Sequence, residues 1–176
     1  MQNQSILCPG KVFLLGEYLV LTGGPGLTVA TLPKFELRIL GENGSSLADI
    51  FHPLSPAGTL LQKHISHSRN ASSRAQWIDP YDTPIGVGSS SAQFLCSAAA
   101  LDLKAVGDLK SLLSLYWETI GISQGIRPSG ADIASQWQGG VNLFENRTVT
   151  QSKVLTLNQE TLAEIFHRRF FLFFTG

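Results

Sequence analysis

The chain has 176 residues, of which 43% are hydrophobic and 15% are charged. This length fits one domain of ordinary size, or one domain with part of another. The 13 basic residues balance the 13 acidic residues, so the composition gives no sign of a nucleic-acid partner or of an anionic membrane surface, and it leaves small polar or anionic ligands open.

The N-terminal segment "MQNQSILCPG" lacks a positively charged start followed by an apolar stretch, so no secretory signal is predicted. The run "SAQFLCSAAALDL" is shorter than the roughly 20 apolar residues that span a bilayer, so no membrane span is predicted. Cys8 and Cys96 are isolated in apolar contexts, which suits packing as thiols in a reduced, cytoplasmic protein. No metal-ligand histidine is predicted among His52, His64, His67 and His167.

The N-terminal part predicts an antiparallel sheet. Apolar residues dominate 12–15 and 18–21, and "TGGPG" at 22–26 supplies the glycine and proline that a chain reversal needs. A strand pattern resumes at 27–32. The segment "KFELRIL" at 34–40 alternates apolar and polar residues with a period of two, as a half-buried strand does.

The middle of the chain predicts three helices and a strand. A helix starts at Ser55, and "AQWID" is a short strand. A Gly-Ser turn opens into an Ala/Leu-rich helix from about Ser91 to Leu103. The apolar spacing of "LKSLLSLYWETI" predicts another helix, capped by Asp108.

The C-terminal part predicts a short helix in "ADIASQWQGG", strands in "VNLFE" and "SKVLTL", a helix in "NQETLAEIFHRR" and a strand in "FFLFF". The complete pattern indicates an α+β sandwich in which helices cover a mixed or antiparallel sheet. The apolar segment 170–175 is typical of a strand that is covered on both faces, which predicts association through it, for example in a homodimer.

The segment "GVGSSSA" at 86–92 is the sharpest local signal. Its two glycines let the backbone turn tightly and approach a ligand without side-chain obstruction. Its three serines add hydroxyls at a helix start, where free N–H groups and the helix dipole favour an anion. The segment predicts a phosphate site, and a plain serine N-cap is the alternative that the motif alone leaves open.

Two further segments carry charges that suit phosphoryl chemistry. Asp132 follows a Pro-Ser-Gly turn at a helix start, where a carboxylate either faces a cavity or is an ordinary helix charge. Lys11 is the sole charge of the first strand, and Glu17 follows a glycine in the same predicted hairpin. Taken alone, Lys11 would be explained as a lysine at a sheet edge and Glu17 as a glutamate that faces solvent. Beside an anion-binding loop, they supply the cation and the base that phosphoryl transfer uses.

In this order and spacing, the three segments resemble the motifs of the GHMP kinases, the family of galactokinase, homoserine kinase, mevalonate kinase and phosphomevalonate kinase. "PGKVFLLGEYLVL" is similar to the first motif, "GVGSSSA" to the second, and "SGADIASQWQGG" to the segment of mevalonate-type members that carries the catalytic aspartate. The resemblance covers nearly the whole chain. It implies that residues 1–176 are the N-terminal, ATP-binding domain of such a kinase, without its C-terminal domain, and that the sandwich contains a left-handed βαβ unit.

The resemblance also implies roles for individual residues. Asp132 would accept or orient the proton of the attacking hydroxyl, with Lys11 beside it, and Glu17 and Tyr18 would shape the acceptor site. An aspartate has a pKa of about 3.9 in water and is a weak base towards an alcohol, so the ammonium and the metal would carry much of the work. Mg²⁺ would lie on Ser90. The ATP phosphates would lie on the second motif, whose residues are Gly86, Val87, Gly88, Ser89, Ser90 and Ser91.

The acceptor implied by the resemblance is a hydroxyl or a phosphate of a small molecule, and Tyr18 with the Ser-Gly-Ala-Asp segment favours mevalonate or phosphomevalonate over galactose. Mevalonate kinases carry a further Mg²⁺-ligating glutamate on the helix before the aspartate, and Glu118 lies on that helix out of register. The family's third glycine-rich motif has no match, so catalysis by residues 1–176 alone is expected to be weak or absent. The alternatives are a non-catalytic GHMP-like module that binds a nucleotide or a partner, and an α+β domain whose Gly-Ser loop only caps a helix.

Overall fold

The computed structural model describes residues 4–41, 44–81, 86–121, 128–145 and 153–154, and the structural statements below concern these residues. The strands are β1 (Gln4–Leu15), β2 (Pro25–Leu40), β3 (Ser45–Ser46), β4 (Arg74–Ile78), β5 (Val141–Glu145) and β6 (Lys153–Val154). The α-helices are α1 (Pro56–His64), α2 (Ser89–Ala100), α3 (Leu109–Ile120) and α4 (Ala131–Gln138). The 3₁₀ helices are η1 (Leu19–Thr22), η2 (Leu47–Asp49), η3 (Ile65–His67) and η4 (Lys104–Gly107).

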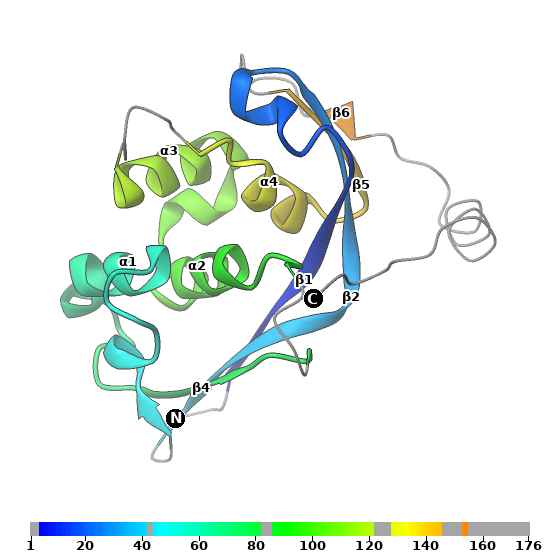
Figure 1. The fold of residues 1–176 in the computed structure, drawn as a ribbon. Coiled ribbons are helices and arrows are strands. Elements are labelled where there is room, and N and C mark those ends of the chain that lie inside the picture. The colour runs from blue at the N-terminus through cyan, green and yellow to red at the C-terminus, as the bar shows by residue number, and fades with distance from the viewer. Residues whose placement is uncertain (1–3, 42–43, 82–85, 122–127, 146–152, 155–176) are drawn as a thin grey trace.

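The strands form one curved sheet, and the four α-helices lie together on one of its faces (Figure 1). The long strand β2 is central. β1 pairs along one edge of it, while β4 and β5 pair with different halves of its other edge. β3 extends the sheet beyond β4, and β6 extends it beyond β5. The predicted α+β sandwich is therefore confirmed. Every strand pairing in the described residues is antiparallel, and the left-handed βαβ unit stays a prediction.

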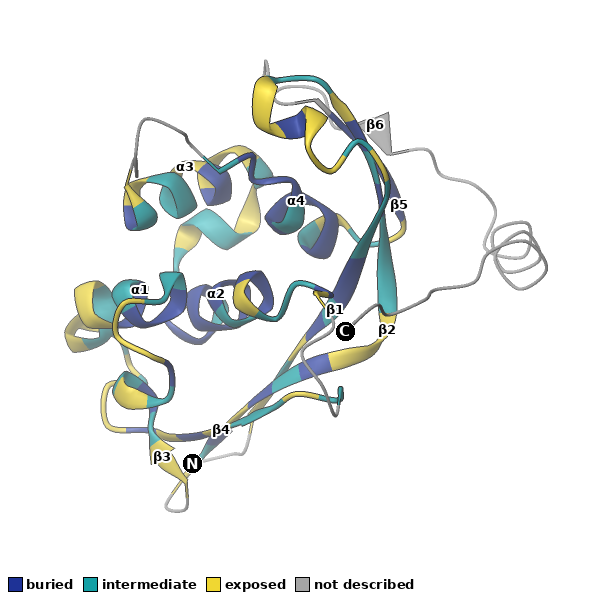
Figure 2. Ribbon diagram, viewed as in Figure 1, coloured by how far each residue is buried: buried dark blue, intermediate teal, exposed yellow. Residues whose placement is uncertain are grey.

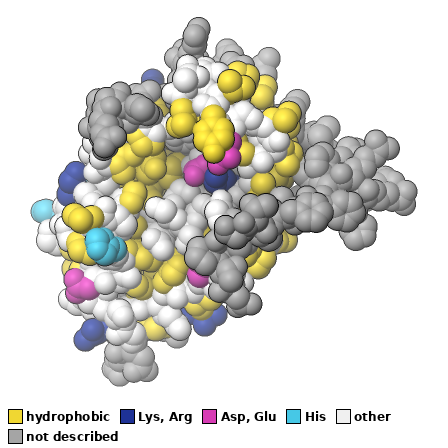
Figure 3. All heavy atoms as spheres, viewed as in Figure 1, with side chains coloured by type: hydrophobic (Ala, Val, Ile, Leu, Met, Phe, Trp, Pro, Cys, Tyr) yellow, Lys and Arg dark blue, Asp and Glu magenta, His cyan; other side chains and the backbone are white. Residues whose placement is uncertain are grey.

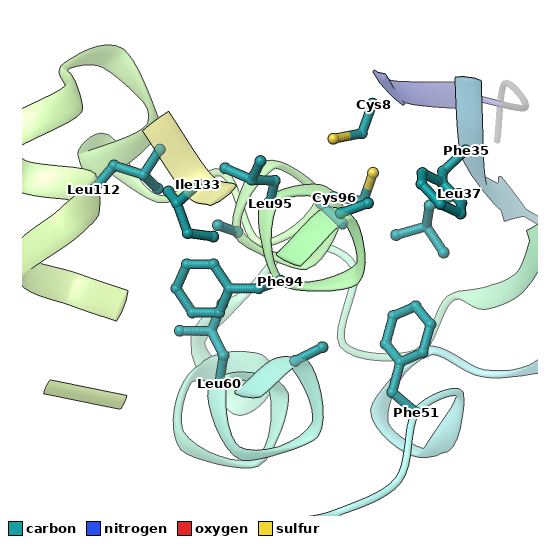
Figure 4. Packing of buried hydrophobic residues seen from close by; sticks show 14 of the residues in the cluster. Cys8, Phe35, Leu37, Phe51, Leu60, Phe94, Leu95, Cys96, Leu112 and Ile133 are labelled. Carbon is teal, nitrogen blue, oxygen red and sulfur yellow. The ribbon is translucent and has the colours of Figure 1, made fainter. Parts of the chain in front are cut away.

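The hydrophobic core lies between the sheet and the helices (Figure 2). From the sheet, Phe35 and Leu37 are fully buried, as the alternation of 34–40 predicts. From the helices, Phe94 of α2 and Ile133 of α4 are fully buried, and they lie beside Leu60 and Leu112 in the same core (Figure 4). Burying a large apolar side chain stabilises the fold by about 1.5–3 kcal/mol. The helix α2 contacts α1, α4, β1 and β2, which explains why so many of its residues are small.

The two cysteines belong to this core. Cys8 of β1 and Cys96 of α2 are buried free thiols whose side chains point toward each other (Figure 4). The hydrogen bond with Cys8, together with burial, raises the pKa of Cys96 well above the usual range of a thiol. Both cysteines are buried in the hydrophobic core, so the prediction that they serve as packing groups is confirmed.

The structure corrects the predicted elements in two places. Residues 18–21 are not a strand, because the backbone there bonds locally: Val20 N donates to Gly16 O at 3.1 Å and Gly24 N donates to Leu19 O at 2.8 Å. These residues form η1 instead. The helix predicted from Ser91 to Leu103 is α2, which begins and ends earlier because Gly88 takes the left-handed conformation at its N-cap and Leu101 is its C-cap.

Other predicted elements are found, and the two strand segments predicted at 27–32 and 34–40 are parts of the single strand β2. Ser55 caps α1 and Asp108 caps α3, each through its side-chain oxygen, and "AQWI" and "VNLFE" lie in strands. The predicted helix in "NQETLAEIFHRR" and the apolar strand at 170–175 lie outside the described residues, as does most of "SKVLTL". Among the helices of the described ranges, none has the length and apolar character to cross a membrane.

Candidate active site

The strand β1 and the loop before α2 touch each other through their backbones. Lys11 N donates to Val87 O at 2.9 Å. The preceding Gly10 is closely packed, since a Cβ there would lie 2.6 Å from Thr31 Oγ1 and 2.8 Å from Tyr81 Oη. The first two segments of the sequence that suggested phosphoryl chemistry are therefore joined directly.

The loop itself has the backbone of an anion-binding turn. Gly86 and Gly88 have φ angles of +69° and +84°, which glycine adopts without strain. Gly88 is the N-cap of α2, and no side-chain oxygen in the described ranges caps this helix. Ser91 Oγ donates to Gly88 O at 2.9 Å, so this hydroxyl is directed at the loop's own backbone. The first N–H groups of α2 are thus left for a ligand at the positive end of the helix dipole.

The helix α4 places Asp132 opposite this loop. Asp132 lies in the first turn of α4, after the N-cap Gly130. Gly130 has a φ of +78°, which favours glycine, and a Cβ there would also lie 2.6 Å from Leu113 Cδ2. Trp117 Nε1 donates to Pro128 O at 2.8 Å and anchors the turn that leads into the helix.

Lys11 and Asp132 form an ion pair at the centre of the site. Lys11 Nζ lies 2.9 Å from Asp132 Oδ1, and the lysine side chain is 7% exposed while the aspartate is 41% exposed. Lys11 Nζ also lies 4.6 Å from the ring centroid of Phe13. A lysine is almost never buried unless it is paired, so the pair explains how a strand tolerates this charge. The exposed part of the carboxylate is open to a ligand.

Two open hollows meet at this ion pair. In Figure 3, acidic and basic side chains lie next to a hydrophobic group on the surface between η1 and α4. The apolar hollow has a volume of about 260 Å³ and is lined by Lys11, Phe13, Glu17, Tyr18, Val20, Leu21, Tyr116, Pro128, Ser129, Gly130 and Asp132. The loop hollow has a volume of about 460 Å³ and is lined by Lys11, Glu17, Asp79, Tyr81, Gly86, Val87, Gly88, Ser89, Ser90 and Asp132.

Most of the residues predicted for the site come together around these hollows. Lys11, Glu17 and Asp132 line both, Tyr18 lines the apolar hollow, and residues 86–90 line the loop hollow. Two do not. Ser91 is buried behind the loop. Glu118 on α3 lines neither hollow, and its backbone oxygen accepts a hydrogen bond from Lys63 at 3.5 Å.

The sequence interpretation missed Asp79. Its side chain lines the loop hollow, accepts a hydrogen bond from Ser89 Oγ at 3.1 Å and another from Tyr81 N at 3.0 Å. The only signal was the unusual segment "IDPYDTP" before the glycines.

The sequence interpretation also missed Tyr116, which lines the apolar hollow. Burial, and to a lesser degree the charge of Asp132, raises the pKa of Tyr116 to about 12, so the phenol keeps its proton and can donate to a ligand.

The oxygen atoms of the loop hollow suit a hard cation that is also held by phosphate. The hydroxyl of Ser90 and the carboxylates of Asp79 and Asp132 line the same space. Mg²⁺ prefers oxygen ligands and commonly takes one or two carboxylates together with substrate phosphates. Among the described residues, no group of three or more His, Cys, Asp or Glu side chains is arranged to hold a metal by itself.

Comparison with known proteins gives matches among solved structures only. No protein-family model matches the chain, and no curated protein matches it. Mevalonate kinase from Methanococcus jannaschii matches with a TM-score of 0.60 and 16% identity over 84% of this chain and 55% of that one. A D-glycero-D-manno-heptose 1-phosphate kinase from Bacteroides thetaiotaomicron matches with a TM-score of 0.65 and 16% identity over 93% of this chain and 63% of that one.

Phosphomevalonate kinase from Streptococcus pneumoniae, in complex with phosphomevalonate and AMPPNP, matches with a TM-score of 0.60 and 15% identity over 94% of this chain and 53% of that one. This chain thus spans between half and two thirds of the length of the three kinases. Its fold is the one that these GHMP kinases share, so the resemblance seen in the sequence is confirmed at the level of the fold.

Proposed function

We propose that this chain is the N-terminal, ATP-binding part of a GHMP-type small-molecule kinase that works in the cytoplasm. The observation that carries the proposal is the ion pair between Lys11 and Asp132, which lies where an anion-binding loop and an apolar hollow meet. The proposal is supported by the fold shared with mevalonate, phosphomevalonate and heptose-phosphate kinases. A cation, a carboxylate and a phosphate loop in one place are the parts that phosphoryl transfer requires.

The loop hollow fits the phosphates of a nucleotide. A Cβ on Gly86 would meet nothing within 4 Å, whereas one on Gly88 would lie 3.0 Å from Gln136 Nε2 and 3.1 Å from Lys11 Cγ. A ligand can therefore approach the loop backbone closely at Gly86, while the backbone at Gly88 is packed against Gln136 and Lys11. In this proposal residues 86–90 hold the ATP phosphates through N–H groups and serine hydroxyls. Mg²⁺, when bound at Ser90 with Asp79 or Asp132, supplies charge neutralisation at the phosphates.

In the proposed reaction, a hydroxyl acceptor lies in the apolar hollow with its oxygen beside Asp132. The acceptor oxygen forms a bond to the γ-phosphorus, the bond from that phosphorus to the β,γ-bridging oxygen breaks, and the hydroxyl proton passes to Asp132. Lys11 holds the carboxylate in place and stabilises the negative charge that builds up on the transferred group. A phosphate acceptor needs no such proton transfer. In that case Lys11 stabilises the negative charges of the acceptor phosphate and of the transferred phosphoryl group.

The apolar hollow supports an acceptor that is small and partly hydrocarbon. Phe13, Val20 and Leu21 line one part of it, and Glu17 and Tyr116 add polar atoms. Its volume of about 260 Å³ is slightly below the usual range of ligand pockets, which suits a small ligand. Mevalonate or phosphomevalonate is therefore the acceptor that we propose, on the basis of this lining and of the fold.

The test is calorimetric titration of the chain with Mg·ATP, followed by an assay for transfer of the γ-phosphoryl group to mevalonate and to phosphomevalonate. We expect binding by the wild type and about tenfold weaker binding by Ser90→Ala, because one hydroxyl that contacts charged phosphate is lost. The matched control is Ser114→Ala, an exposed serine in the middle of α3, which should bind as the wild type does.

The outcomes separate the candidate functions. Binding with slow transfer to one of the two acceptors supports the proposal, since the chain spans only about half of the kinases that share its fold. If the chain binds Mg·ATP but transfers no phosphoryl group to mevalonate, to phosphomevalonate or to similar small acceptors, it is a non-catalytic nucleotide-binding module. Absence of Mg·ATP binding would overturn the proposal.

A further inference from the structure

Gln136 joins the strand of Lys11 to the phosphate loop from behind. This side chain of α4 is 3% exposed, and its Nε2 donates to Pro9 O at 2.8 Å and to Gly88 O at 3.0 Å. Pro9 lies in β1 two residues before Lys11, and Gly88 is the N-cap of α2. One amide group therefore spans two segments that are far apart in the sequence and meet at the candidate site.

The orientation of this amide follows from its neighbours. Carbonyl oxygens only accept hydrogen bonds, so the NH₂ group must face Pro9 and Gly88, because the reverse orientation would place Oε1 against two other oxygens. Oε1 of Gln136 is buried and has no hydrogen-bond partner within the described ranges. The two donated bonds are thus what places the side chain.

The bond to Gly88 fixes the direction of a peptide group in the loop. Gly88 O accepts hydrogen bonds from Ala92 N at 3.0 Å, from Ser91 Oγ at 2.9 Å and from Gln136 Nε2 at 3.0 Å. In a planar trans peptide the N–H points opposite to the C=O, so Ser89 N–H points away from all three donors. Ser89 lines the loop hollow. Holding the carbonyl from behind therefore aims an N–H group of the first helical turn at the ligand side.

We propose that Gln136 is a positioning residue of the phosphate site. It holds the Gly88 peptide at a fixed place relative to Lys11, so that the loop N–H groups and the ammonium converge on the same phosphate. This role rests on the proposed function. It acts through the loop backbone, since Gln136 lines neither hollow.

The test compares Gln136→Met with Gln138→Met. Methionine has a similar length and no donor, so the first variant loses both bonds with little change in packing. Gln138 lies on the same helix and is exposed, which makes the second variant a matched control. Affinities for Mg·ATP and for adenosine are measured by calorimetry, and amide hydrogen exchange is measured over residues 86–91.

We expect Gln136→Met to bind Mg·ATP about tenfold more weakly, the loss that follows from one or two neutral hydrogen bonds. Its affinity for adenosine should equal that of the wild type, because adenosine has no phosphate. Amide exchange over 86–91 should be faster in this variant and unchanged in Gln138→Met. If Gln136→Met does not fold, Gln136→Asn keeps the amide on a side chain too short for both carbonyls, and the same result is expected.

Two results would overturn the inference. One is wild-type affinity and wild-type exchange in Gln136→Met, and the other is an equal loss for Mg·ATP and adenosine, which would indicate general loosening of the fold. If the wild-type chain itself binds no Mg·ATP, the proposed function fails, and the exchange over 86–91 still decides whether Gln136 holds the loop.

Discussion

The two hollows share Lys11, Glu17 and Asp132 but differ in what forms the rest of their walls. The rest of the loop hollow consists of Asp79, Tyr81 and the glycine, valine and serine residues of 86–90, where Gly86 and Gly88 have left-handed φ angles. The rest of the apolar hollow consists of larger side chains from β1, from η1 with its N-cap Tyr18 and from α3, together with the turn 128–130 before α4. Backbone N–H groups bind a group that many ligands share, such as phosphate. The side chains of the other hollow determine which acceptor fits, and each of them can be substituted separately. The comparison indicates that the nucleotide and the acceptor can be perturbed separately.

The largest expected effect comes from the shared ion pair. Lys11→Met should weaken Mg·ATP binding by about 10- to 100-fold, because a hydrogen bond to a charged group is lost. Asp132→Asn should weaken it less than Lys11→Met does, because the loss of one oxygen ligand for Mg²⁺ is offset by the removal of a negative charge near the phosphates. Calorimetric titration checks both variants. Equal weakening in the two would show that the pair acts on binding only through the fold.

The loop hollow is tested by its glycines. Gly88→Ala should destabilise the fold by about 2–3 kcal/mol, of which about 1–2 comes from the left-handed φ and the rest from crowding against Gln136 and Lys11. Gly86→Ala has the same kind of φ but meets nothing within 4 Å, so it should cost only about 1–2 kcal/mol. Urea unfolding measures both, and a larger loss for Gly86→Ala would contradict the packing described for the loop.

The apolar hollow is tested by Leu21→Ala. Leu21 is 47% exposed and lines only the apolar hollow, so the variant should keep Mg·ATP affinity within about twofold of the wild type. Calorimetry with Mg·ATP is the measurement. A strong loss of nucleotide affinity would show that the two hollows are not separable.

The smallest expected effect, on thermal stability, concerns the N-terminus of α3, which differs from that of α2 in having a side-chain cap. The N-terminus of α3 is closed by Asp108, whose pKa is lowered by hydrogen bonds from Ser111 and from Lys110 N. A carboxylate whose pKa is lower in the folded state stabilises the fold above its unfolded-state pKa, and this stabilisation is lost as the pH falls through the folded-state pKa.

Asp108→Asn keeps a capping oxygen that does not titrate. The wild type should therefore have a slightly higher melting temperature than Asp108→Asn at neutral pH, and the gap should close as the pH falls below about 4. Thermal unfolding followed by circular dichroism at several pH values measures it. A gap that does not change with pH would show that the charge of Asp108 adds nothing to the cap.

The residues that could be predicted are those whose local sequence already restricts them. The pair of glycines before α2, the Pro-Ser-Gly turn before Asp132 and the capping residues Ser55 and Asp108 act through neighbouring backbone. Their elements were predicted to within a few residues. The apolar run 18–21 reads as a strand but forms η1, because its pattern does not distinguish a paired strand from a partly exposed helical turn beside a hollow, which Leu21 lines.

The residues that could not be predicted act across the fold. Asp79 matters because β4 ends beside the loop hollow, and Gln136 matters because α4 passes behind both β1 and the loop. Neither relation is encoded by spacing along the chain. A lone aspartate in a loop and a glutamine on a short helix look the same in sequence whether or not a ligand site is near.

The central claim is that the loop before α2 binds the phosphates of ATP next to Lys11. The most direct measurement is a Mg·ATP titration followed by the backbone amide NMR signals of the chain. The account predicts that the largest chemical-shift changes fall on residues 86–90, with a further change at Lys11. Saturable binding whose shifts lie elsewhere, or no change at these residues at millimolar Mg·ATP, would contradict it.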